Sequence, residues 1–128
     1  MTEKIVLRDV ENQGLVRLPV VLSIAGSDPS GGAGIEADLK TFTAHKVFGT
    51  TCITAVISQN TQQLLTIDRT SESQIKNILK LVFDDFVEGS NGRLKIIKTG
   101  MLSSESIKVL VLHLDYLKLN DIKLVVDP

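Results

Sequence analysis

Apolar residues along the chain form short continuous runs that alternate with stretches of helical spacing. Four runs rich in branched side chains predict buried strands at residues 20–25, 49–57, 94–99 and 123–127. Between these runs, apolar side chains recur every three or four positions, as on one face of an amphipathic helix. The predicted buried faces comprise Ile35, Leu39 and Phe42; Ile75, Ile78, Leu79, Val82 and Phe86; and Ile107, Leu110, Val111 and Leu114. This alternation predicts an α/β fold with a mostly parallel central sheet flanked by helices.

Polar residues indicate where several of these elements begin and end. Ser71 and Gln74 have the spacing of a capping box at the start of the second helix, and Ser103 opens the third. The first helix is expected to end near Lys46. A short additional strand is predicted at residues 64–67.

The segment between the first strand and the first helix is the most distinctive part of the sequence. It carries four glycines, which are Gly26, Gly31, Gly32 and Gly34. Glycine accepts positive φ angles and lets a ligand approach the backbone amides closely. A helix that begins directly after such a loop adds a positive dipole end. We expect these amides to bind a ligand; the alternative is a tight turn that holds none.

Two well-known glycine loops do not fit this segment. The phosphate loop of nucleoside triphosphatases needs Lys-Ser/Thr after its last glycine, whereas Gly34 is followed by Ile35 and Glu36. Residues 32–37 do fit the dinucleotide pattern. However, that fold also needs an acidic residue at the end of the second strand, and residues 58–60 contain none. A dinucleotide fold is therefore a minor alternative.

Composition and charge narrow the class of protein. The 128 residues are 43% hydrophobic and 23% charged, with a formal net charge of −1, which argues against a nucleic-acid surface. No apolar run is long enough to span a membrane, and the first residues lack the order of a signal peptide. The single cysteine, Cys52, is expected to pack in the core, and it suits a reducing compartment. We therefore expect a cytoplasmic protein.

Candidate site residues follow the predicted strands. In parallel sheets, ligands bind beyond the carboxyl ends of the strands. The glycine loop, residues 58–61, residues 99–101 and Asp127 should all lie at that edge. Their convergence predicts one binding site.

Four of these segments resemble hydroxymethylpyrimidine/phosphomethylpyrimidine kinase, a ribokinase-like family of thiamine biosynthesis. They are residues 25–41, 53–61, 98–102 and 125–128. The resemblance implies a three-layer ribokinase-like fold, truncated after about half the domain. It makes residues 19–128 the substrate-binding N-terminal half of the kinase domain. Residues 1–18 are weakly patterned and are expected to form an extension outside the core, with a short strand at residues 4–8.

The same resemblance implies an aminopyrimidine pocket made of Ala33, Asp38, Ile57, Gln59 and Met101. The chemistry agrees, because a glutamine amide offers a donor and an acceptor side by side, and methionine gives a polarizable contact for a ring. Asp127 is placed near the phosphates or Mg²⁺. ATP and Mg²⁺ are implied for the complete enzyme, with no metal ligand assigned. No nucleic-acid or membrane partner is expected, and a homo-oligomer is left open.

Two other functions are left open by the sequence. Pyridoxine-type kinases share the glycine loop, but Gln59-Asn60-Thr61 favours the pyrimidine. A small-molecule-binding module without catalytic activity is the alternative outside the enzymes.

The resemblance also generates a prediction about activity. The family's nucleotide pocket and its Gly-Thr-Gly-Cys segment have no counterpart in this sequence, and Cys52 does not replace that cysteine. Phosphoryl transfer needs groups positioned around the γ-phosphate. Purified residues 1–128 should therefore show no ATP-dependent phosphorylation of the pyrimidine in a coupled assay, and measurable turnover would contradict this prediction.

Overall fold

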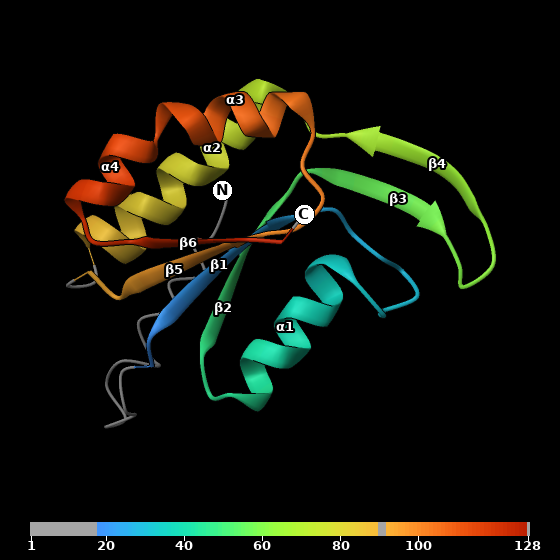
Figure 1. Ribbon diagram of the computed structural model, residues 1–128, viewed down its shortest axis with the longest axis horizontal. Coiled ribbons are helices and arrows are strands. Elements are labelled where there is room, and N and C mark those ends of the chain that lie inside the picture. The colour runs from blue at the N-terminus through green and yellow to red at the C-terminus, as the bar shows by residue number, and fades with distance from the viewer. Residues whose placement is uncertain (1–17, 90–91, 128) are drawn as a thin grey trace, which may run out of the picture.

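The computed structural model describes residues 18–89 and 92–127, which form a sheet with helices on both faces (Figure 1). Within this part of the chain, four parallel strands lie in the order β2-β1-β5-β6. Their bounds are β1 Val20–Ala25, β2 Phe48–Ile53, β5 Leu94–Thr99 and β6 Lys123–Val126. The predicted α/β architecture is confirmed.

The first helix of the described chain covers one face of the sheet, and the later helices cover the other (Figure 1). The first is α1 (Gly34–Ala44), and the opposite face carries α2 (Glu72–Phe83), α3 (Ser104–Leu112) and α4 (Leu114–Leu119). A π-helical turn, η2 (Asp84–Glu88), continues α2. No helix of the described residues is both long and apolar enough to cross a membrane.

The predicted strand at residues 49–57 is two strands that belong to different sheets. After β2, the chain bends at Thr54 and continues as β3 (Ala55–Gln59), which pairs antiparallel with β4 (Leu64–Arg69) in a two-stranded ribbon. The bend is fixed by the Thr54 amide, which donates to the carbonyl of Ala25 (2.9 Å), and by its hydroxyl, which donates to the carbonyl of Met101 (2.7 Å). A continuous apolar run does not reveal such a bend, because side chains on both sides of it are buried.

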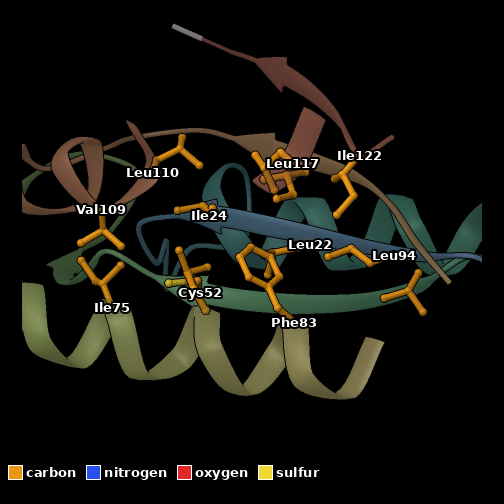
Figure 2. Packing of buried hydrophobic residues seen from close by; sticks show 13 residues of the cluster. Leu22, Ile24, Cys52, Ile75, Phe83, Leu94, Val109, Leu110, Leu117 and Ile122 are labelled. Carbon is orange, nitrogen blue, oxygen red and sulfur yellow. The ribbon is translucent and has the colours of Figure 1, made fainter. Parts of the chain in front are cut away.

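The core lies between the sheet and the helices α2, α3 and α4 (Figure 2). All six residues of β1 are buried, because this strand has a neighbour on each side and helices on both faces. Of the predicted face of α2, Ile75 and Leu79 are buried, and Ile78, Val82 and Phe86 are partly buried against the same cluster. Phe83, which the spacing did not single out, is also buried. Cys52 is also fully buried in this cluster, as expected.

The predicted buried face of the third helix is largely wrong. Ile107, Val111 and Leu114 are exposed, and the buried residues of α3 are Ser106, Val109 and Leu110. The hydroxyl of Ser106 can be buried because it donates to the Ser103 carbonyl (2.8 Å) within a capping box. The N-terminal cap therefore places a serine where the apolar spacing alone predicts a solvent-facing position. The strand predicted at residues 4–8 lies outside the described residues.

Truncation of the core strand β1 tests this packing. Leu22 is fully buried, and Leu22→Ala should lower the free energy of unfolding by about 2–5 kcal/mol, because the cavity it leaves closes only partly. Leu119, which is 86% exposed, gives a matched control, and Leu119→Ala should change stability by less than about 0.5 kcal/mol. Urea titrations followed by circular dichroism measure both values; equal losses would contradict the assigned core.

Candidate functional site

A cavity of about 430 Å³ lies at the carboxyl ends of β1 and β5, beside the β3–β4 ribbon. The glycine loop, β3, the end of β5 and Asp127 all contribute to it, so the four predicted segments do converge. Gln59 reaches the cavity from the antiparallel ribbon, however, and not from a strand of the parallel sheet. The lining residues are Gly26, Ser27, Asp28, Ala33, Gly34, Ile57, Gln59, Leu64, Lys98, Gly100, Met101 and Asp127.

Asp28 organises the glycine loop, and the sequence analysis missed it. Its side chain is buried, and its Oδ2 accepts hydrogen bonds from the amides of Gly32 (3.0 Å) and Ala33 (2.9 Å). Its Oδ1 accepts from the amide of Ser30 (3.0 Å), the Ser30 hydroxyl and Gln59 Nε2 (2.9 Å). The four glycines of this segment indicate a role for the backbone. The signal that could have identified Asp28 is the turn sequence Asp28-Pro29-Ser30, which offers a side-chain acceptor.

These bonds correct the expectation that the loop amides are free for a ligand. The amide of Gly31 donates to the Asp28 carbonyl (2.8 Å), and those of Gly32 and Ala33 donate to the Asp28 carboxylate. A buried carboxylate thus occupies the place where a bound anion would be expected. Gly26 and Gly34 line the cavity, but the loop as a whole is not a phosphate cradle.

Gly34 is required by the way the loop joins α1. Its φ is +58°, and a Cβ at this position would lie 2.3 Å from the carbonyl oxygen of Gly26. That same carbonyl accepts from the amide of Ile35 (3.0 Å), so strand end and helix start are in direct contact. Any other residue would separate them.

The pKa of Asp28 reflects its donors. The hydroxyl of Ser30 is the largest cause, opposed by burial and reinforced by the Ser30 amide, Gln59 and the Ala33 amide, and together they lower the pKa to about 2. The carboxylate is therefore ionised at neutral pH and can only accept hydrogen bonds.

Ile57, Gln59 and Met101 lie at the cavity, as predicted for the pocket. The amide of Ile57 donates to the Ser27 hydroxyl (3.0 Å), which ties the ribbon to the glycine loop. The Met101 side chain packs over Gly26, where an added Cβ would lie 2.6 Å from its methyl group. An apolar surface and a polar amide therefore face the same space.

Asp38, in contrast, is not among the lining residues. Its carboxylate accepts from the Ser23 hydroxyl (2.6 Å) and from Lys98 Nζ (3.0 and 3.1 Å). Because both of its oxygens are already bonded beneath the site, this geometry gives Asp38 a supporting position.

Lys98 is a second site residue that the sequence analysis did not single out. It lines the cavity and lies between two carboxylates, bonded to Asp38 and 3.3 Å from Asp127 Oδ2. Partial burial disfavours its charged form, but the hydrogen bonds and charges of Asp38 and Asp127 outweigh this and raise the pKa of Lys98. Lys98 is therefore a fixed cation at the end of β5.

The described residues show neither a reactive thiol nor a metal centre. Burial raises the pKa of Cys52 to about 11, so this thiol stays protonated at neutral pH. Residues 18–89 and 92–127 also contain no group of three or more His, Cys, Asp or Glu side chains that could hold a metal ion.

Comparison with known proteins identifies the family. The sequence model of phosphomethylpyrimidine kinase matches residues 28–128. The chain belongs to this family. A hydroxymethylpyrimidine/phosphomethylpyrimidine kinase of Saccharomyces cerevisiae is 46% identical over 112 residues, which are 88% of this chain but 19% of that protein. This chain therefore spans about a fifth of the length of this relative.

Solved structures give the same fold. The crystal structure of phosphomethylpyrimidine kinase from Clostridium difficile aligns with a TM-score of 0.69 at 40% identity, over 86% of this chain and 45% of that one. A pyridoxal kinase from Staphylococcus aureus, in complex with AMP-PCP and pyridoxal, aligns with a TM-score of 0.69 at 29% identity, over 87% and 39%. The fold is thus that of the ribokinase-like kinases, of which this phosphomethylpyrimidine kinase family is a part.

The low pKa of Asp28 predicts an acid-dependent loss of stability. Its ordinary value is 3.8 and its folded value about 2, so the stabilisation it provides is fully present above about pH 4 and is lost as the pH falls through about 2. Asp28→Asn should remove this part of the pH dependence, whereas Asp115→Asn, at an exposed carboxylate on α4, should not. Urea midpoints between pH 5 and pH 2 measure the difference, and identical profiles for both variants would contradict the assigned role.

Proposed function

We propose that this chain carries the substrate-binding part of an ATP-dependent kinase that phosphorylates 4-amino-5-hydroxymethyl-2-methylpyrimidine and its monophosphate in thiamine biosynthesis. The observation that supports this most directly is the Gln59 side chain, which lies at the cavity beside the apolar side chains of Ile57 and Met101. Family membership and the 46% identity to a yeast kinase of this name support the reaction type.

The chemistry of the cavity suits a flat aminopyrimidine. A glutamine amide can pair an acceptor with the exocyclic amine and a donor with the ring nitrogen. Met101, which is 47% exposed, and Ile57 offer apolar contacts for the ring. We propose Ile57, Gln59 and Met101 as the side chains that bind the ring. Ala33 takes part through its position in the loop, since its amide is already bonded to Asp28.

ATP and Mg²⁺ are the implied co-substrate and ion. Carboxylate oxygens suit Mg²⁺, which in phosphoryl-transfer sites is held by one or two carboxylates together with substrate phosphates and water. Asp127 is 63% exposed at the cavity, and it is the described residue that best fits this role. Lys98 beside it would balance negative charge as a phosphoryl group approaches. We assign no catalytic base among the described residues.

A pyridoxal-type kinase is the second candidate, because the Staphylococcus aureus neighbour was crystallised with pyridoxal. Gln59-Asn60-Thr61 favours the pyrimidine in our proposal. The single buried cysteine agrees with a cytoplasmic enzyme.

Truncation of Gln59 tests the proposed substrate. In the intact protein as its source organism makes it, Gln59→Ala should weaken binding of the aminopyrimidine about tenfold or more, since two hydrogen bonds to the ring are lost. Gln62→Ala provides a matched control, because Gln62 is an exposed glutamine in the same β3–β4 turn and does not line the cavity. Isothermal titration calorimetry measures the affinity of each variant for the aminopyrimidine and for pyridoxal. Tighter binding of pyridoxal, or equal effects of the two variants, would contradict the proposal.

A further inference from the structure

The hydrogen bond between Gln59 and Asp28 restricts what the cavity can present to a ligand. Gln59 Nε2 donates to Asp28 Oδ1 at 2.9 Å, and both residues line the cavity. Asp28 is only 6% exposed, and its two oxygens also hold the amides of Ser30, Gly32 and Ala33. The carboxylate is therefore fixed in place independently of Gln59.

The nature of the two groups determines which way the Gln59 amide faces. An ionised carboxylate has no proton to donate, so it can bond only to the NH₂ end of the amide. A Gln59 side chain rotated by half a turn would place Oε1 against the negative charge of Asp28. Such a contact between two acceptors, one of them charged, is repulsive. Oε1 and the second N–H of Gln59 are thus available to a ligand, each at a fixed position in the cavity.

From this arrangement we infer that Asp28 is a positioning residue that selects the substrate by fixing the orientation of the Gln59 amide. The inference rests on the proposed function and adds the cause of its specificity. With Oε1 in a set place, the cavity accepts a ring that presents an amine next to an unprotonated ring nitrogen. It rejects a ring that presents an oxo group next to an N–H, because acceptor would face acceptor and donor would face donor.

Asp28→Asn tests this inference through a ratio of affinities. The asparagine oxygen can still accept from the amides of Gly32 and Ala33. Its NH₂ then lies where Asp28 Oδ1 faces Gln59, and the Ser30 amide loses its acceptor. Gln59 is free to rotate and to accept from this NH₂. In the intact protein, the preference for the aminopyrimidine over its 4-oxo analogue should fall at least tenfold, measured as the ratio of the two Kd values by calorimetry.

Two further variants separate positioning from a general effect on folding. Ser30→Ala removes the hydroxyl that donates to the same Oδ1 atom but leaves Gln59 unchanged, and it should keep the wild-type ratio. In a Gln59→Ala background, Asp28→Asn should not change the ratio further. The inference is wrong if Asp28→Asn weakens the binding of both ligands equally. It is also wrong if Asp28→Asn changes the ratio of the two Kd values in the Gln59→Ala background. If the wild-type protein binds neither ligand, the proposed function fails and the inference fails with it.

A measurement on the unaltered protein covers the case in which Asp28→Asn does not fold. Nitrogen-15 spectra of the intact protein, with the Gln59 resonances assigned from Gln59→Ala, report directly on the side-chain NH₂. We expect one of its two protons to exchange slowly with solvent and to be shifted downfield, as for a donor to a carboxylate. Two protons with the shifts and exchange of a solvated glutamine, such as Gln62, would overturn the inference.

Discussion

The carboxylate of Asp28 is a buried charge, and the structure around the cavity follows from the need to supply it with donors. A charge removed from water is stable only when hydrogen bonds replace its hydration. Here the donors are the amides and the hydroxyl of its own loop and the side chain of Gln59. The loop must wrap closely around one side chain to deliver them, and Gly34 at φ +58° makes that path possible. The end of β1, the start of α1 and the β3–β4 ribbon are joined at this point.

The second charged group of the site is connected to the core in a different way. Ser23 lies in the middle of the fully buried strand β1, and its hydroxyl is bonded to Asp38 of α1. Asp38 in turn holds Lys98 at the end of β5, and Lys98 contacts Asp127 after β6. The sheet and the helix α1 together therefore fix the position of one ammonium group. A lysine placed between two carboxylates keeps its charge, which the raised pKa of Lys98 reflects.

Hydrophobic patterning was sufficient to predict the parallel sheet, the helices and the edge at which the site lies. Strand β1 is a nearly continuous apolar run, β5 keeps Leu94, Ile96 and Ile97 between its lysines, and α2 has apolar residues at helical spacing. The bend at Thr54 was not predictable, because it depends on bonds to Ala25 and Met101, which are distant in the sequence. The orientation of α3 was missed for a related reason, since Ser106 is buried through its bond to Ser103 and not through apolar character.

The roles of the site residues show the same limit. Gln59, Ile57 and Met101 were identified from the resemblance, and the structure places them at the cavity. Asp28 and Asp38 lie in the same quoted motif, yet one lines the cavity and the other lies beneath it. The sequence shows that a carboxylate is present at each position, but the donors that surround it come from other elements. Those donors determine whether the carboxylate faces a ligand, a lysine or its own backbone.

The two parts of the cavity differ in character, and this difference bears on how a kinase would use it. Gln59, Ile57 and Met101 provide neutral contacts, whereas Lys98 and Asp127 provide a charged pair. A neutral heterocycle loses little hydration energy on entering the first part, while a charged phosphoryl group needs the second. Asp28 separates the two functions, because it occupies the loop amides and so removes an alternative anion site beside Gln59. In the proposed function, the ring would therefore bind beside Gln59, and a phosphoryl group would lie beside the ammonium group of Lys98.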